Sequence, residues 1–225
     1  MKEKADKKFE LATGERPLLR AEIQHFKDCQ LKYFTLSITA TGVLIGLGAK
    51  LGTDSEYPSL FFLLPLIIVL PCWGIFFDKA TSITRIVGYY RVLETFLLSG
   101  KEEYLYIGWE NALALGRRFD KKTKNEKIQK PSKTQTYWFL TYATFFSLAV
   151  LSNSFSVIVF LSSGGPRASL YIILIASIAT AATAMSSGRL VYHLMHGSKS
   201  YHYNESHWKE LLSVNGEYAK CFLKK

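Results

Sequence analysis

The chain has 225 residues, 20% of them charged, with a mean hydropathy of +0.08 and a net charge of +10. These averages suit a soluble domain, but four apolar runs without an acidic residue exclude one: 33–49, 60–77, 137–161 and 170–194. Each run approaches the roughly 17 to 25 residues that a helix needs to cross a bilayer. The positive charge flanks these runs, where anionic lipid headgroups attract it, so no nucleic-acid partner is expected.

Residues 1–32 are predicted to form a cytoplasmic N-terminal segment. Their charges continue to the edge of the first run, unlike the short charged start of a cleaved signal peptide, so the first span is expected to anchor itself. Residues 1–14 are charged and weakly apolar, and we expect them to be disordered. A helix is expected to begin at Pro17. Its apolar stripe consists of Leu19, Ile23 and Phe26.

The first transmembrane hairpin, 33–77, combines a stripe of small residues with two prolines. The stripe follows three- and four-residue steps along the first span: Thr35, Thr39, Gly42, Gly46 and Ala49. Small side chains let two helices approach closely in lipid, which predicts packing within the chain, a subunit contact or a pore lining. Pro65 and Pro71 interrupt backbone hydrogen bonding in the second span, which predicts a kink or a free carbonyl at a pore.

Residues 78–136 are predicted to form a cytoplasmic helical segment and a basic linker. An amphipathic helix is expected to end at Ser99 and Gly100, before a second helix around Trp109. The stretch 85–94, followed by Gly108, Trp109 and Glu110, reads like a family signature but matches no motif with assigned roles. Basic residues expected to face a partner or lipid headgroups are Arg85, Arg91, Arg117, Arg118, Lys121 and Lys122.

The second hairpin, 137–194, is longer and richer in small polar residues. The fourth span repeats the small-residue device in Ala176, Thr180, Ala184 and Gly188. Asn153 is the most polar side chain at depth, and we expect it to bond between helices or to line a pore. The cytoplasmic tail, 195–225, is predicted to contain one short helix. The apolar face of that helix comprises Trp208, Leu211 and Leu212.

The distribution of basic residues predicts the topology. Of the 28 lysines and arginines, 8 fall in residues 1–32 and 12 in residues 78–136, whereas the two short connections carry one each, Lys50 and Arg167. Short loops rich in lysine and arginine remain cytoplasmic. We therefore expect an all-α polytopic protein of the inner (cytoplasmic) membrane, with four transmembrane helices in two hairpins and both termini in the cytoplasm.

The sequence offers no recognisable catalytic chemistry. It contains no nucleophile with a base, no paired-carboxylate site and no phosphate-binding loop, so we expect no catalytic residue, no cofactor and no enzymatic activity. Four histidines lie close together near Glu205: His193, His196, His202 and His207. Their spacing matches no zinc signature, and their aromatic neighbours suit a membrane interface, so no metal site is expected.

The layout of two short membrane hairpins joined to cytoplasmic helices resembles small multi-span effectors of bacterial anti-phage and nucleotide-signalling loci. These include the SLATT and four-span SMODS-associated groups. The resemblance implies a homo-oligomer that perturbs or permeabilises the inner membrane when a cytoplasmic protein partner, encoded nearby, signals infection. Two alternatives remain open, namely a non-conducting anchor or scaffold that recruits a cytoplasmic partner and a small channel or transporter.

Overall fold

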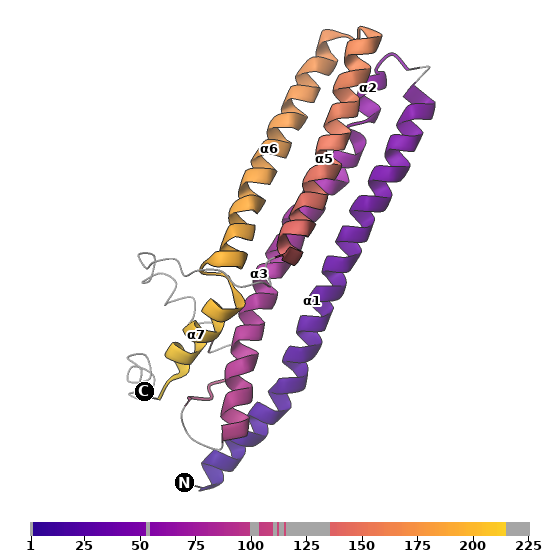
Figure 1. The fold of residues 1–225 in the computed structure, drawn as a ribbon. Helices are drawn as coiled ribbons and strands as arrows, with labels where there is room; N and C mark the ends of the chain where they lie inside the picture. The colour runs from indigo at the N-terminus through magenta and orange to yellow at the C-terminus, as the bar shows by residue number, and fades with distance from the viewer. Residues whose placement is uncertain are drawn as a thin grey trace. The chain divides into compact units, whose positions relative to one another are not determined.

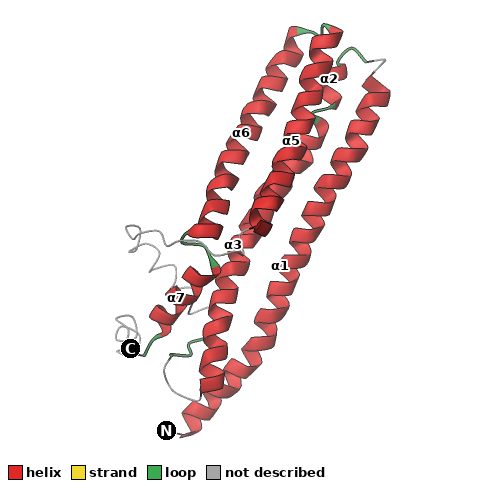
Figure 2. Cartoon of the chain, viewed as in Figure 1, coloured by secondary structure: helices red, strands yellow, loops and turns green. Residues whose placement is uncertain are grey.

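The computed structural model describes residues 2–52, 55–99, 104–109, 112, 115 and 136–214. Within these ranges the chain is all-helical, and its only extended pairing is an isolated antiparallel bridge between Tyr104 and Ser213. The helices are α1 Lys2–Leu51, α2 Pro58–Phe61, α3 Leu64–Ser99, α5 Thr136–Ser163, α6 Arg167–His196 and α7 Tyr201–Leu212 (Figures 1 and 2).

Four helical stretches are long and apolar enough to cross a membrane, and they lie in α1, in α2 with α3, in α5 and in α6. This confirms the prediction of four candidate spans and fits a multi-pass membrane protein. Helix α1 has 50 residues, and at a rise of about 1.5 Å per residue it is roughly 75 Å long. Because the hydrocarbon of a bilayer is about 30 Å thick, much of α1 must extend beyond it.

Three helix boundaries differ from the predictions. Residues 2–14 are helical rather than disordered, and Pro17 lies inside α1 instead of starting a helix. Burial explains the first difference, since Ala12 is fully buried and joins a hydrophobic cluster. The second span is broken after Phe61, and α3 then continues without interruption to Ser99. The predicted amphipathic helix is therefore an extension of the second span.

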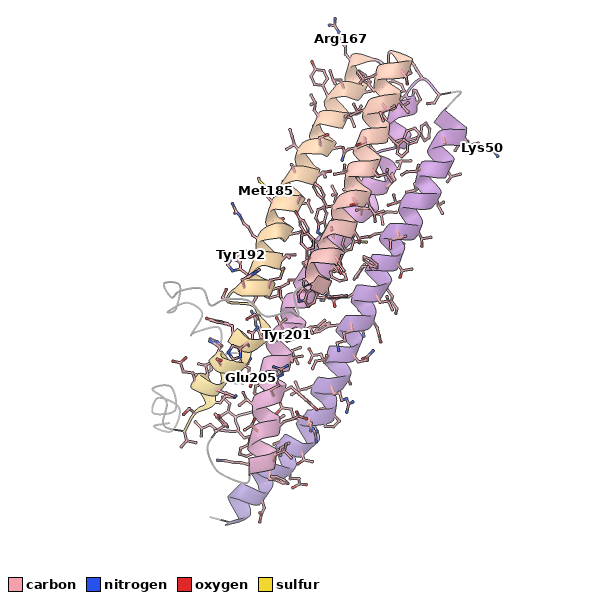
Figure 3. All side chains as sticks on the ribbon, in the orientation of Figure 1. Lys50, Arg167, Met185, Tyr192, Tyr201 and Glu205 are labelled. Atoms are coloured by element: carbon pink, nitrogen blue, oxygen red, sulfur yellow. The ribbon has the colours of Figure 1, made fainter. Side chains whose placement is uncertain are left out.

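The chain forms two compact units. We call the first the apolar unit, comprising Asp28–Ala80 and Ser132–Tyr192. Its centre is aromatic: Trp73 stacks on Phe145 at 6.1 Å between ring centroids, and Phe76 meets Phe145 edge-on at 5.6 Å. Figure 3 shows Lys50, near the end of α1, and Arg167, the first residue of α6, at the same end of this unit.

The second unit, which we call the polar unit, comprises Met1–Lys27, Thr81–Pro131 and His193–Lys225. Its described core is built from α1, α3, α7 and the segment after α3. The fully buried members are Ala12, Leu19, Ile86, Tyr89, Val92, Leu93, Ala112, Trp208, Leu211 and Leu212. Ile23 and Phe26 pack against this core beside Leu19, as do Trp208, Leu211 and Leu212 of α7, which confirms both predicted apolar faces.

Candidate functional site

The small-residue stripe of α1 lies on an exposed face. Thr39, Gly42 and Gly46 are exposed, and a Cβ added at either glycine would meet no atom within 4 Å. The buried face instead carries Ser37 and Thr41, whose hydroxyls donate to carbonyls of their own helix. Ser37 and Gly46 are nine residues apart, which at roughly 3.6 residues per turn places them on opposite sides of the helix. Within the described residues, the chain leaves the glycine face of α1 uncovered.

The corresponding stripe of α6 is covered by α5. The Tyr142 hydroxyl donates to the Ala184 carbonyl at 3.1 Å. A Cβ added at Gly188 would lie 3.4 Å from the same hydroxyl oxygen. The ring of Tyr142 therefore packs against a stretch of α6 backbone that only small residues leave accessible. Ala176 belongs to this stripe through its carbonyl, which accepts the Thr180 hydroxyl at 2.9 Å.

Asn153 joins α5 to α6 in the apolar unit. Its Nδ2 donates to the Thr180 hydroxyl oxygen at 3.0 Å and to the Ala149 carbonyl at 3.0 Å, while the Ser177 hydroxyl donates to its Oδ1 at 3.2 Å. Both ends of the amide are thus bonded, as buried polar groups require. Of the two roles expected for Asn153, the described contacts are those of an interhelical bond.

The two prolines occupy different positions in α3. Pro65 is the second residue of the helix, where its missing N–H costs little because first-turn amides have no partner within a helix. Pro71 lies inside α3 and removes one hydrogen bond from its interior. The break that precedes α3 is braced from α5, since the Ser156 hydroxyl donates to the Ser59 carbonyl at 2.8 Å.

In the polar unit, α7 docks closely on α3. A Cβ added at Gly88 would lie 2.8 Å from both the carbonyl carbon and the Cβ of Asn204, so the two backbones can meet only at a glycine. Beside this contact the indole Nε1 of Trp208 donates to the Arg85 carbonyl at 3.1 Å. Trp208 is 1% exposed and meets Tyr89 edge-on at 5.6 Å. The aromatic anchor and the glycine notch fix the position of α7.

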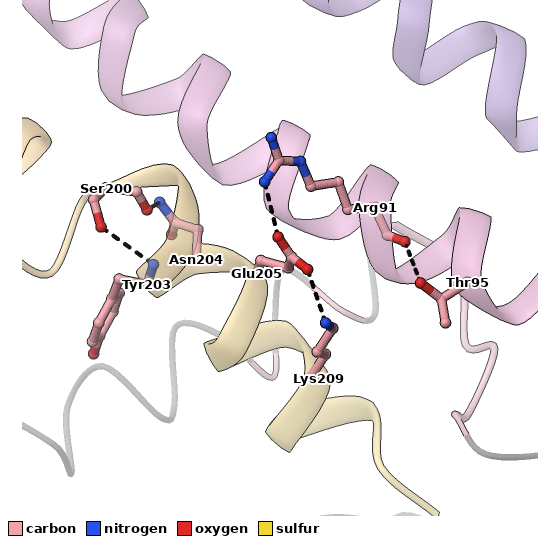
Figure 4. A network of polar contacts seen from close by, with 7 residues as sticks. All are labelled: Arg91, Thr95, Ser200, Tyr203, Asn204, Glu205 and Lys209. Carbon is pink, nitrogen blue, oxygen red and sulfur yellow. Dashed lines mark hydrogen bonds and ion pairs between the residues drawn. The ribbon is translucent and has the colours of Figure 1, made fainter. Parts of the chain in front are cut away.

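A network of charged side chains lies beside the contact between α3 and α7 (Figure 4). Arg91 and Lys209 each donate to Glu205 at 2.8 Å. The hydrogen bond from Lys209, followed by that from Arg91, lowers the pKa of Glu205, and Glu205 in turn raises the pKa of Lys209. Ser200 caps α7, because its hydroxyl accepts the Tyr203 N–H at 3.2 Å.

Glu15 of α1 holds the segment that follows α3. Its carboxylate accepts the Trp109 N–H and the Tyr89 hydroxyl, the latter at 3.3 Å, and it is also hydrogen-bonded to Tyr106. Burial, together with the charge of Glu15, raises the pKa of both tyrosines. Gly108 precedes Trp109 with a φ of +79°, a conformation that favours glycine.

The signature-like stretch thus forms the structural centre of the polar unit. The Arg85 carbonyl accepts the Trp208 indole N–H, and Gly88 leaves room for the backbone of Asn204. Tyr89 donates its hydroxyl to Glu15, and Arg91 forms an ion pair with Glu205. Arg16 adds a further bridge, 2.7 Å from Glu94. No pattern in the sequence indicated that Glu15 and Asn204 are partners of this stretch. An interior glycine in an amphipathic helix was the available signal, because it marks a close backbone approach.

A cavity of about 10 Å³ in the polar unit is lined by Tyr89, Tyr106 and neighbouring apolar residues, and this is about the size of one water molecule. Within the described ranges, no group of three or more histidine, cysteine, aspartate or glutamate residues could hold a metal. Four predicted partner-facing residues, Arg117, Arg118, Lys121 and Lys122, lie outside the described residues.

Searches of protein-family models, curated proteins and solved structures found no match to this chain.

Proposed function

We propose that the protein is an oligomeric effector of the inner membrane that perturbs or permeabilises the bilayer in response to a cytoplasmic signal. In this proposal the four spans form two hairpins, and both termini lie in the cytoplasm with the polar unit. A role in bacterial anti-phage defence is proposed from the resemblance of the layout to SLATT-like and four-span SMODS-associated effectors. The protein is proposed to act without a cofactor and without catalysis.

The observation that carries this proposal is the uncovered glycine face of α1. Gly42 and Gly46 lie one turn apart, and an added Cβ at either would meet no described atom within 4 Å beyond the nearby backbone of α1 itself. In lipid, helices associate through close backbone packing, and paired glycines four residues apart permit it. A second copy of the chain is therefore the proposed neighbour of this face. The α6 stripe cannot serve in the same way, because Tyr142 already covers part of it.

The proposed input is the polar unit, including the basic segment that it contains after α3. The α7 contact, with its Gly88 notch and Trp208 anchor, gives this unit a defined surface on which a partner can act. Arg117, Arg118, Lys121 and Lys122 are proposed to face that partner or lipid headgroups.

Liposome leakage with purified protein tests the effector proposal. We expect dye release that the double substitution Gly42→Leu and Gly46→Leu abolishes, together with loss of oligomers by native mass spectrometry in detergent. Gly74→Leu is the matched control, since Gly74 is also an exposed glycine of a span with no atom within 4 Å of an added Cβ. The proposal would be contradicted if the liposomes released no dye with any candidate partner present and if the double substitution left the oligomers unchanged.

The scaffold alternative is favoured by one observation, the built core of the polar unit, which could present a partner without any response of the spans. It predicts that charge reversal at Arg117, Arg118, Lys121 and Lys122 abolishes partner co-purification and activity, whereas the α1 double substitution changes neither. Selective ion conductance by the protein alone would instead indicate a channel.

The proposed topology has its own test. In a cysteine-free background, Lys50→Cys and Arg167→Cys should react with a membrane-impermeant maleimide in intact cells. Lys199→Cys should react only after the cells are permeabilised. The reverse labelling pattern would overturn the proposed orientation.

A further inference from the structure

Helix α1 carries an apolar stripe on the exposed surface of the polar unit. Four residues at steps of three and four share one face of the helix, and we call them the leucine stripe: Leu11, Gly14, Leu18 and Ala21. All four are exposed, Leu11 to 55% and Leu18 to 70%. The core of the polar unit is instead contacted by Ala12 and Leu19, which lie on another face of α1. The leucine stripe therefore has no cover among the described residues.

The lipid bilayer cannot cover the leucine stripe. Exposed charges lie in the same stretch of helix, at Glu10, Arg16 and Arg20, and charged side chains are costly within hydrocarbon. An amphipathic helix can bury its apolar face by lying flat among the headgroups. However, α1 is one continuous helix that includes a candidate span, so its first half cannot lie flat while the span crosses the bilayer (Figure 1). A protein partner is the cover that remains.

The spacing of the leucine stripe continues without a break along α1. From Ala21, steps of four and three residues reach the glycine face through His25, Asp28, Lys32, Thr35 and Thr39. Every residue of this series is exposed, as are Gly42 and Gly46 at the next two steps. A repeat of seven residues with two contact positions is the pattern by which helices pack as a coiled coil. A partner that matches the entire repeat must itself enter the membrane, because the glycine face belongs to a candidate span.

Charged residues within the repeat favour a second copy of this chain in one alignment. Copies of one chain share the topology set by their basic residues, so their α1 helices run in the same direction. With the two helices in register, Asp28 of each copy lies beside Lys32 of the other. A shift of one heptad keeps only one of these contacts and moves the other Asp28 beside Leu18. Polar residues at contact positions of a coiled coil specify the register in this way, at some cost in stability.

We propose that two copies of the chain pack in parallel and in register along α1, and that the leucine stripe is the part of this contact outside the hydrocarbon. Each copy covers Leu11 and Leu18 of the other, because identical surfaces meet in a twofold contact. The inference rests on the oligomer proposed above, and it adds a water-exposed half to the contact at Gly42 and Gly46. Helix α1 thereby joins the copies both within the bilayer and beyond it.

Disulfide crosslinking in membranes tests the leucine stripe. The probe is the full chain with Cys29, Cys72 and Cys221 replaced by alanine and a single cysteine introduced. Under oxidation with copper phenanthroline, Leu18→Cys should form covalent dimers. Arg20→Cys is the matched control, since Arg20 is also exposed but lies on another face of α1, and it should remain monomeric. Equal crosslinking at the two positions would overturn the proposal. An adduct of Leu18→Cys whose mass is not twice that of the chain would assign the stripe to a different protein.

A cysteine within the span separates this inference from the proposed oligomer. Gly42→Cys reports contact between copies inside the bilayer, and we expect dimers at both Gly42→Cys and Leu18→Cys. Dimers at Gly42→Cys alone would overturn the contact at the leucine stripe and leave the oligomer standing. Absence of dimers at both positions would overturn the contact and contradict the oligomer as well.

Charge exchange between copies tests the register. Asp28→Lys makes positions 28 and 32 both basic, whereas Lys32→Asp makes both acidic, so copies of either variant repel one another. When the two variants are coexpressed with different affinity tags, each should capture the other, and each should capture its own kind roughly tenfold less. An ion pair within one helix cannot produce this pattern, because each variant has lost that pair. Equal capture of both kinds would overturn the alignment.

Discussion

Helices α1 and α6 of the apolar unit carry similar stripes of small residues, but the chain uses them differently. On α6, Gly188 makes room for Tyr142, whose hydroxyl also bonds to the backbone of that helix. On α1, a Cβ added at Gly42 or Gly46 would meet no described atom within 4 Å beyond the nearby backbone of the helix itself. Small residues at helical spacing therefore indicate that a close approach is possible, while the large residue opposite them decides whether it occurs within the chain. Gly88 of the polar unit resembles Gly188, because another residue of the same chain, Asn204, packs directly against it.

The largest effect is expected at Gly88. Gly88→Leu places side-chain atoms where the backbone of Asn204 lies, 2.8 Å from the position of the added Cβ. Helix α7 must then leave α3 and expose Trp208 and Leu211, with an expected destabilisation of about 3 kcal/mol or more. Hydrogen exchange of α7 is the measurement. Gly14→Leu is the control in the same unit, since nothing lies within 4 Å of its added Cβ. Unchanged protection of α7 in Gly88→Leu would contradict the close contact.

A smaller loss is expected at Gly188. Gly188→Leu should displace the Tyr142 ring, break its bond to Ala184 and destabilise the apolar unit by roughly 1–3 kcal/mol. Unfolding in mixed detergent micelles would measure it. Gly74→Leu, at a glycine that faces no atom within 4 Å, should have little effect. Equal stability of the two variants would remove the distinction between covered and uncovered glycines.

The hydrogen bonds of Asn153 should contribute still less to the stability of the apolar unit. Asn153→Leu removes the bonds to Thr180 and Ser177, and interhelical hydrogen bonds in membranes average about 0.6 kcal/mol with a maximum near 1.7. A double-mutant cycle with Thr180→Val isolates the interaction. A coupling energy of zero would show that this bond does not join α5 to α6.

The network around Glu205 predicts a weak dependence on pH. Because the native pKa of Glu205 is lowered, its contribution to stability is present above the unfolded pKa and is lost as the pH falls through the lower native value. The pH window therefore lies below about 4.3. Partly exposed ion pairs contribute roughly 0.2–1 kcal/mol. Hydrogen exchange of α7 between pH 7 and pH 3 should show a smaller acid-induced loss of protection in Glu205→Gln than in the unaltered chain. Identical pH profiles would contradict the network.

The smallest effect on the isolated chain is expected at the uncovered face of α1. Gly42→Leu and Gly46→Leu remove no contact and create no clash within the described residues, so each should change monomer stability by less than about 0.5 kcal/mol. Unfolding at high detergent-to-protein ratio, where copies are diluted apart, would measure it. A large loss under these conditions would place the stripe inside the monomer fold and end the comparison with α6.

The sequence predicted the four spans because roughly twenty apolar residues without an acid have few other stable environments. It also predicted which faces of α1 and α7 are buried in the polar unit, since Leu19 and Trp208 lie on stripes at helical spacing. It did not predict the break after Phe61, because residues on both sides of it are equally apolar. Nor could it show which stripe is covered, since that depends on Tyr142, 46 residues before Gly188.

Pro17 and Glu15 are two positions whose structural roles could not be predicted from the neighbouring sequence. A proline favours the first turn of a helix, yet burial of Ala12 and Leu19 on either side keeps α1 continuous through Pro17. Glu15 looked like one of several charges on a solvated segment. Its role depends on Tyr89, Tyr106 and Trp109, which are at least 74 residues away. Tertiary contacts determine the helical conformation at Pro17 and the hydrogen bonds of Glu15, and the neighbouring sequence does not indicate those contacts.

The docking of α7 on Gly88 has a consequence for biosynthesis. Residues 201–212 follow all four candidate spans in the chain, so the ribosome makes α3 long before the helix that covers it. Until α7 emerges, the face around Gly88 and Tyr89 has no partner from that helix, although α1 and α3 are complete. Completion of the polar unit is therefore a late event that waits for the last span. Nascent chains stalled before residue 201 should expose this face to chaperones.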